Sequence, residues 1–164
     1  MNYLPHVNLF QLAVYKNEAV LPFLDPSRFR GGGSLKIEEI RKSFSVNASF
    51  DACKIIEVKA VSLDDHLKGV GKIHFIKLDI EGGEYNAFLG MENLIKKRQV
   101  DVVSFELNAV GLGDELLPLR DLLKSYEASY GVSFYTISAE GDTVMEELEV
   151  LFKIPHIDSV LVCF

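Results

Sequence analysis

Apolar residues in this chain gather in short runs that alternate with stretches of helical periodicity. Runs rich in Val, Ile, Leu and Phe predict strands at residues 6–15, 54–60, 73–80, 100–107, 132–137 and 159–164. Leucines and other apolar residues that recur every three or four positions predict helices at 84–97 and 115–128. The second half therefore has the order β-α-β-α-β…β, which predicts an α/β fold with a mostly parallel, doubly wound sheet.

Local signals predict where some helices begin. Ser62 has the character of a helix N-cap, with Asp64 and Asp65 in the first turn and Asp65 at the capping-box position. Asp114 is expected to cap the helix 115–128. The sequence RGGGS at residues 30–34 predicts a loop, although a triple glycine can also cradle a phosphate where a helix N-terminus follows.

Composition limits the classes of function. The 164 residues are the size of one domain, so residues 1–164 are taken as a single unit. The net charge of −7 and the lack of a basic stripe argue against a nucleic acid partner. No apolar run approaches the ~20 residues of a membrane-spanning helix, and the N-terminus does not resemble a signal peptide. Two cysteines far apart, Cys53 and Cys163, favour free thiols in a reducing compartment, and hence a cytoplasmic location. Four scattered histidines predict no metal site.

Acidic side chains follow two consecutive predicted strands. Asp79 and Glu81 come at the end of one strand, and Glu106 comes at the end of the next. Because a β-α-β crossover usually places its two parallel strands side by side, we expect these three carboxylates to lie near one another. Ligands of open α/β sheets bind beyond the carboxyl ends of the strands, so this edge is the candidate site.

Two neighbouring residues have alternative interpretations. Lys77 lies on the same side of its strand as Asp79, and either forms an ion pair with it or serves the site. Glu84 either faces the site or stabilises the N-terminus of the helix that it begins. Gly82 and Gly83 permit a tight turn between these groups.

The same residues carry a family resemblance. The sequence KLDIEGGE at 77–84, followed by FLG at 88–90, resembles the pattern K-x-D-x-E-G-x-E…L-x-G of the FkbM family of methyltransferases. The preceding VSLDDHL at 61–67 is similar to the lead-in helix of that family, and VVSFE at 102–106 is similar to its next strand.

The resemblance implies a Rossmann-like class I methyltransferase fold, with S-adenosylmethionine as the methyl donor and an oxygen of a small molecule or sugar as the acceptor. It implies catalytic roles for Lys77, Asp79 and Glu81. By the same analogy, Asp79 lies near the transferred methyl and Ala13 near the adenine, while Glu84 and Glu106 face the substrate.

One departure from the family pattern changes the expectation. Family members begin with a strand, a Gly-rich turn, a helix and a second strand that ends in an acid, and nothing before His6 can supply these elements. We therefore expect a partial, N-terminally truncated domain that binds S-adenosylmethionine weakly and has unpaired strand edges open to association. The main alternative is a non-catalytic remnant that binds a partner chain. A dinucleotide-binding enzyme using Gly111–Gly113 is a weaker match, because the third glycine position holds Leu116.

Overall fold

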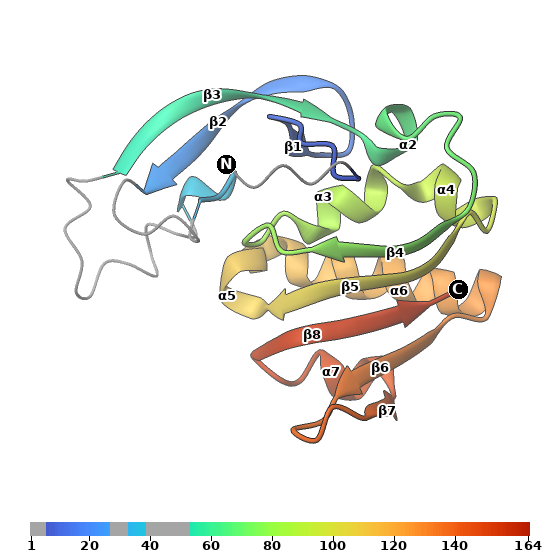
Figure 1. Cartoon of the computed structure of the whole chain (residues 1–164). Helices are drawn as coiled ribbons and strands as arrows, with labels where there is room; N and C mark the ends of the chain where they lie inside the picture. The colour runs from blue at the N-terminus through green and yellow to red at the C-terminus, as the bar shows by residue number, and fades with distance from the viewer. Residues whose placement is uncertain (1–5, 27–32, 39–52) are drawn as a thin grey trace.

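The computed structural model describes residues 6–26, 33–38 and 53–164 (Figure 1). Its strands form two sheets. The smaller sheet has the order β1-β3-β2, with bounds Ala13–Val14, Cys53–Val61 and Ala19–Pro26. The larger sheet has the order β4-β5-β8-β6-β7, with bounds Ile73–Leu78, Val100–Asn108, His156–Cys163, Ser133–Ile137 and Thr143–Glu146.

Short helices connect the strands, and one long helix supports the larger sheet. They are α2 Leu63–His66, α3 Glu84–Leu89, α4 Glu92–Lys96, α5 Ala109–Leu112, the 3₁₀ helix η2 Gly113–Glu115, α6 Leu116–Tyr130 and α7 Leu148–Leu151. Side chains of α3, α4, α6 and α7 share one apolar core with the larger sheet. In this core Phe88 of α3 packs edge-on against Phe105 of β5, with ring centroids 5.4 Å apart.

The expected Rossmann-like fold, with a mostly parallel, doubly wound sheet, is wrong. In the larger sheet β4 and β5 pair in parallel, but β5 with β8, β8 with β6, and β6 with β7 pair antiparallel. The cause is the last part of the chain, where a hairpin leads into β7 and the returning β8 inserts between β5 and β6. The fold is a mixed one, made of two sheets with antiparallel pairings.

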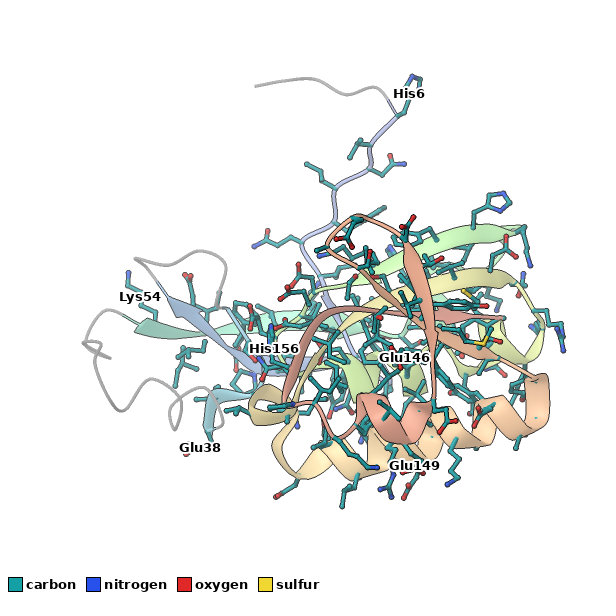
Figure 2. The ribbon with its side chains drawn as sticks, turned by 90° about the horizontal axis from the view of Figure 1, so that it is seen from below. His6, Glu38, Lys54, Glu146, Glu149 and His156 are labelled. Atoms are coloured by element: carbon teal, nitrogen blue, oxygen red, sulfur yellow. The ribbon has the colours of Figure 1, made fainter. Side chains whose placement is uncertain are left out.

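The helices also pack on one face of the larger sheet. Val103, Val162 and Phe134 lie in register across three strands and belong to the core with the helices. Residues whose side chains point to the other face of the sheet include Phe75, which is 56% exposed, and Met145, which is 64% exposed. Figure 2 shows α6 and α7 together on one side of the strands. A doubly wound sheet would bury both faces, so these exposed residues agree with the antiparallel pairings.

Several local predictions are confirmed and others are wrong. Ser62 is the N-cap of α2, and its hydroxyl accepts a hydrogen bond from the Asp65 N–H at 3.1 Å. By contrast, Asp114 lies within η2, and the residue before α6 is Glu115, which makes no side-chain cap. The strand expected at 6–15 is reduced to β1, because only Ala13 and Val14 pair with β3.

The helix expected at 84–97 is interrupted between α3 and α4. A Cβ on Gly90 would lie 2.3 Å from the Tyr15 carbonyl oxygen, so the chain at Gly90 is pressed against the segment after β1. The carboxylate of Asp64 caps the N-terminus of α4, because it accepts hydrogen bonds from the N–H groups of Asn93 and Leu94, at 3.0 and 2.9 Å. Tertiary contacts therefore divide a stretch whose periodicity is continuous.

Candidate functional site

The segment after β4, residues 79–84, is a tight turn that we call the Glu81 turn. Glu81 has a φ of 52° and Gly82 a φ of 94°, both in the left-handed region. The Gly83 N–H donates to the Ile80 carbonyl at 3.3 Å and closes the turn. A Cβ on Gly82 would lie 2.2 Å from the Gly111 carbonyl oxygen, so the turn packs directly against α5 and requires glycine there.

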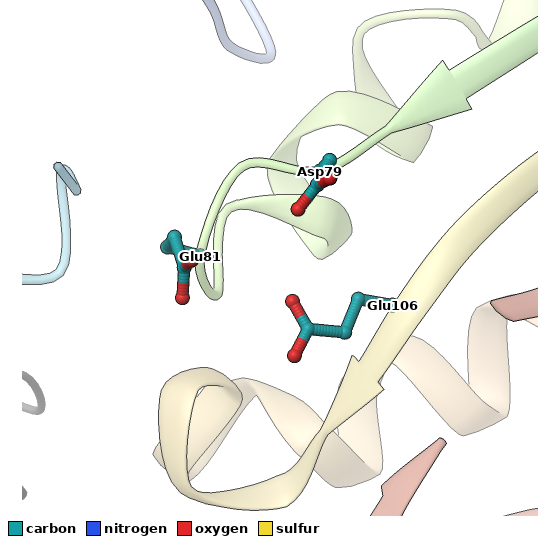
Figure 3. Close-up of side chains that lie close together, drawn as sticks. All are labelled: Asp79, Glu81 and Glu106. Carbon is teal, nitrogen blue, oxygen red and sulfur yellow. The ribbon is translucent and has the colours of Figure 1, made fainter. Parts of the chain in front are cut away.

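Three carboxylates meet at this turn and form what we call the acidic cluster, Asp79, Glu81 and Glu106 (Figure 3). One oxygen from each lies within 4.8 Å of the others. The parallel register explains the meeting, because Leu78 pairs with Phe105 and the two strands end at the same edge. The predicted proximity of these residues is thus confirmed. Such a set of oxygens can ligate one divalent cation, and the expectation of no metal stays a prediction.

Mutual repulsion and burial affect the protonation of the cluster. The pKa of Glu81 is raised, first by burial and then by the charges of Glu106 and Asp79, while His156 opposes the rise. Glu106 accepts from the Asn108 amide at 3.5 Å, and its Oε1 lies 3.4 Å from His156 Nδ1. His156 Nε2 in turn lies 2.9 Å from Asp158 Oδ1.

His156 was missed at the sequence level. It begins β8, about fifty residues after Glu106, and no spacing rule connects the two positions. Only the antiparallel pairing of β8 with β5, in which Asn108 is opposite His156, brings the imidazole to the cluster.

Lys77 and Asp79 form an ion pair, and each side chain is 57% exposed. The structure thus shows the pairing that was one of the two interpretations of Lys77. Because both groups face solvent, the pair contributes little to stability, and Asp79 remains accessible at the end of β4.

Glu84 differs from the other carboxylates because it is fully buried, at 0% exposure. Burial raises its pKa to about 7, and the backbone N–H groups of Glu84, Gly82 and Ile80 oppose the rise. Its Oε1 accepts from the Gly82 N–H at 3.4 Å, while its Oε2 has no hydrogen-bond partner. The carboxylate therefore lies beneath the Glu81 turn.

A cavity of about 710 Å³ lies between the smaller sheet and the Glu81 turn. Ala13 and Asp79, the two residues predicted to contact a cofactor, both line it. Phe10, Ile56, Lys59 and Gly83 contribute to the walls, whereas Glu81, Glu84 and Glu106 are not among the lining residues. The volume is within the range of about 300–1,000 Å³ typical of small-molecule sites.

Of the predicted glycine-rich loop, the structure describes Gly33 and Ser34, and Ser34 contacts the Glu81 turn. Ser34 is fully buried, and its hydroxyl donates to the Glu81 carbonyl at 2.7 Å. Gly33 lines the cavity. Residues 30–32 of the predicted loop lie outside the described residues, so the phosphate alternative stays a prediction.

A comparison with known protein families finds a match that covers most of the chain. Residues 5–130 match the family described as Methyltransferase FkbM domain. The chain belongs to this family of methyltransferases. The matched range contains the whole Glu81 turn and Glu106, but His156 lies outside it.

No curated protein and no solved structure matches the chain. In the part of the chain that the structure describes, no helix is long and apolar enough to cross a membrane.

Proposed function

We propose that this FkbM methyltransferase uses S-adenosylmethionine and methylates an oxygen of a small molecule or sugar. The observation that carries the proposal is the cavity in which Ala13 and Asp79 meet, next to the acidic cluster. The cofactor fits on two grounds: the cavity has a suitable volume, and nearby carboxylates complement a sulfonium charge. We also propose a cytoplasmic location, on the grounds of cysteine usage.

When bound, S-adenosylmethionine supplies an electrophilic methyl group on a positively charged sulfur. Ala13 and Asp79 would hold the cofactor, which would transfer this methyl group to the acceptor hydroxyl oxygen as the carbon–sulfur bond breaks and the hydroxyl proton passes to a base. Asp79 is the residue we assign to orient the hydroxyl and accept its proton, because it is the cluster member that lines the cavity. The rest of the contribution of the protein is the positioning of the acceptor.

The roles proposed for the other charged residues follow from their positions. Glu81 and Glu106 lie beside Asp79, although they do not line the cavity, and their charges make the electrostatic potential near Asp79 more negative. The side chain of Glu84 is buried and does not face the cavity itself. We propose an indirect role for it, in which its carboxylate supports the Glu81 turn through the Gly82 N–H. Lys77 balances the charge of Asp79.

Calorimetric titration with S-adenosylmethionine tests the proposal. We expect weak binding, with a dissociation constant well above micromolar, because the Gly-rich turn and the ribose-binding acid of the family pattern, at ~1.5–3 kcal/mol for each charge-assisted contact, are not recognised in residues 1–164. Asp79→Asn should weaken it further. Asp101→Asn is the matched control, since Asp101 is a surface carboxylate paired with Lys72 and His74. Binding that is absent at millimolar cofactor, or unchanged in Asp79→Asn, would contradict the proposal.

A second candidate function is partner binding through strand edges. Leu9 is 90% exposed and Phe10 63% exposed, and among the described residues 7–12 form no strand pairing. Figure 2 shows the chain projecting from the sheets toward His6, whereas the Phe10 ring packs against the His66 ring, with ring centroids 4.6 Å apart. Within the described chain, β4 also has a hydrogen-bonded neighbour on one side only.

Exposed apolar segments and open edges are sites of association. Light scattering after size-exclusion chromatography should show a mass above that of one chain, and Leu9→Lys should reduce it. A monomer at every concentration would argue against this function.

A further inference from the structure

Glu81 is held in an unusual backbone conformation from three sides. Its φ of 52° is disfavoured for a residue with a side chain, and such residues persist where the surroundings enforce them. Next to it, Gly82 is pressed against α5, and the Gly82 N–H points to the buried carboxylate of Glu84. The remaining contact is the Ser34 hydroxyl on the Glu81 carbonyl.

The Ser34 contact comes from a part of the chain that is distant in sequence and firmly placed. Ser34 forms a β-bridge with Leu24, in which the Leu24 N–H donates to the Ser34 carbonyl at 2.9 Å. Its hydroxyl also accepts from the Lys36 N–H at 2.9 Å, which orients the hydroxyl proton toward Glu81. Lys36 is in turn paired with Glu115 at 2.7 Å.

From this geometry we propose that Ser34 is a positioning residue, which holds the Glu81 turn in the left-handed conformation that directs the Glu81 carboxylate toward Asp79 and Glu106. Without the hydroxyl, the Glu81 carbonyl loses its donor, and only the packing of Gly82 against α5 and the long Gly82 N–H contact to Glu84, at 3.4 Å, still oppose rotation of this peptide unit toward an ordinary conformation. The carboxylate of Glu81 then leaves the acidic cluster. The proposal rests on the proposed function only in taking the acidic cluster as the working site.

A titration of the Glu81 carboxyl group by carbon NMR tests the proposal without any cofactor or acceptor. In wild type, the Glu81 midpoint should lie above the ordinary value of 4.5, because burial, Glu106 and Asp79 all raise its pKa. In Ser34→Ala the midpoint should fall toward 4.5, and the Gly82 amide should exchange its hydrogen about tenfold faster, the factor that one net hydrogen bond provides. Glu81→Gln assigns the signal.

Two further variants separate positioning from general destabilisation. Ser62→Ala removes another buried serine, the N-cap of α2, and should leave the Glu81 midpoint unchanged. Ser34→Thr keeps the hydroxyl and should keep the wild-type midpoint. If Ser34→Ala does not fold, Ser34→Cys replaces it, because a thiol is a weak donor of similar size.

An unchanged Glu81 midpoint in the hydroxyl-free variant would overturn the proposal, as would an equal fall in Ser62→Ala. Failure of S-adenosylmethionine binding would instead affect the proposed function alone.

Discussion

Replacing Glu84 by glutamine should change how the stability of this protein depends on pH. Glu84 is fully exposed to water in the unfolded chain and fully buried in the folded one. Glutamine has nearly the same shape and keeps an oxygen that can accept from the Gly82 N–H, but it cannot ionise. The variant therefore isolates the effect of the buried charge.

The sign and size follow from the pKa of Glu84, which rises from an ordinary value of 4.5 to about 7 on folding. Between these values the folded state binds more protons than the unfolded state, so stability falls as pH rises. The contribution of Glu84 to the free energy of unfolding is fully present below pH 4.5 and is lost as the pH rises through about 7. At about 1.4 kcal/mol per pKa unit, the loss is about 3 kcal/mol.

Urea unfolding followed by circular dichroism, at several pH values between 4 and 8, measures this effect. We expect the free energy of unfolding of Glu84→Gln, measured relative to that of wild type, to rise by about 3 kcal/mol between pH 4 and pH 8. Glu81, whose pKa is also raised, is present in both proteins and cancels from the difference. A difference in unfolding free energy that does not change with pH would refute the raised pKa of the buried Glu84.

Three further predictions concern the framework of the site. Gly82→Ala should lower the free energy of unfolding by more than about 2 kcal/mol, because its φ is 94° and the added Cβ would meet the Gly111 backbone. Gly69→Ala is the control, since Gly69 has a φ of 86° but open space around it, and it should cost about 1 kcal/mol. Equal losses in urea unfolding would contradict the packing of Gly82 against Gly111. Asp64→Ala should cost about 1 kcal/mol in the same assay, because it removes the cap of α4; no loss would mean that the cap is unimportant. Amide hydrogens of residues 9–12 should exchange faster than those of 76–78 in β4; equal protection would show that the N-terminal stretch is paired.

Much of the local structure could be predicted from the sequence. The apolar runs predicted β3, β4, β5, β6 and β8 with small errors at their ends, because strand-forming residues are enriched wherever a chain is buried in a sheet. Among the missed elements, α5, β7 and α7 are short, and their periodicity is too brief to detect. The eight-residue β2 was not predicted either. The motif at 77–84 predicted the family, and the expected β-α-β crossover predicted the proximity of Asp79, Glu81 and Glu106.

The tertiary structure alone decided how the strands are ordered and which distant residues reach the site. Nothing local in residues 156–163 indicates that β8 inserts antiparallel beside β5, yet this insertion made the sheet mixed and brought His156 to Glu106. The sequence predicts that Ser34 lies in a loop, but it does not predict that the Ser34 hydroxyl donates to the carbonyl of Glu81, a residue 47 positions later in the chain. Periodicity reports which side of an element is buried, but the partner that buries it is chosen by packing over the whole chain, so these contacts could be found only in the folded structure.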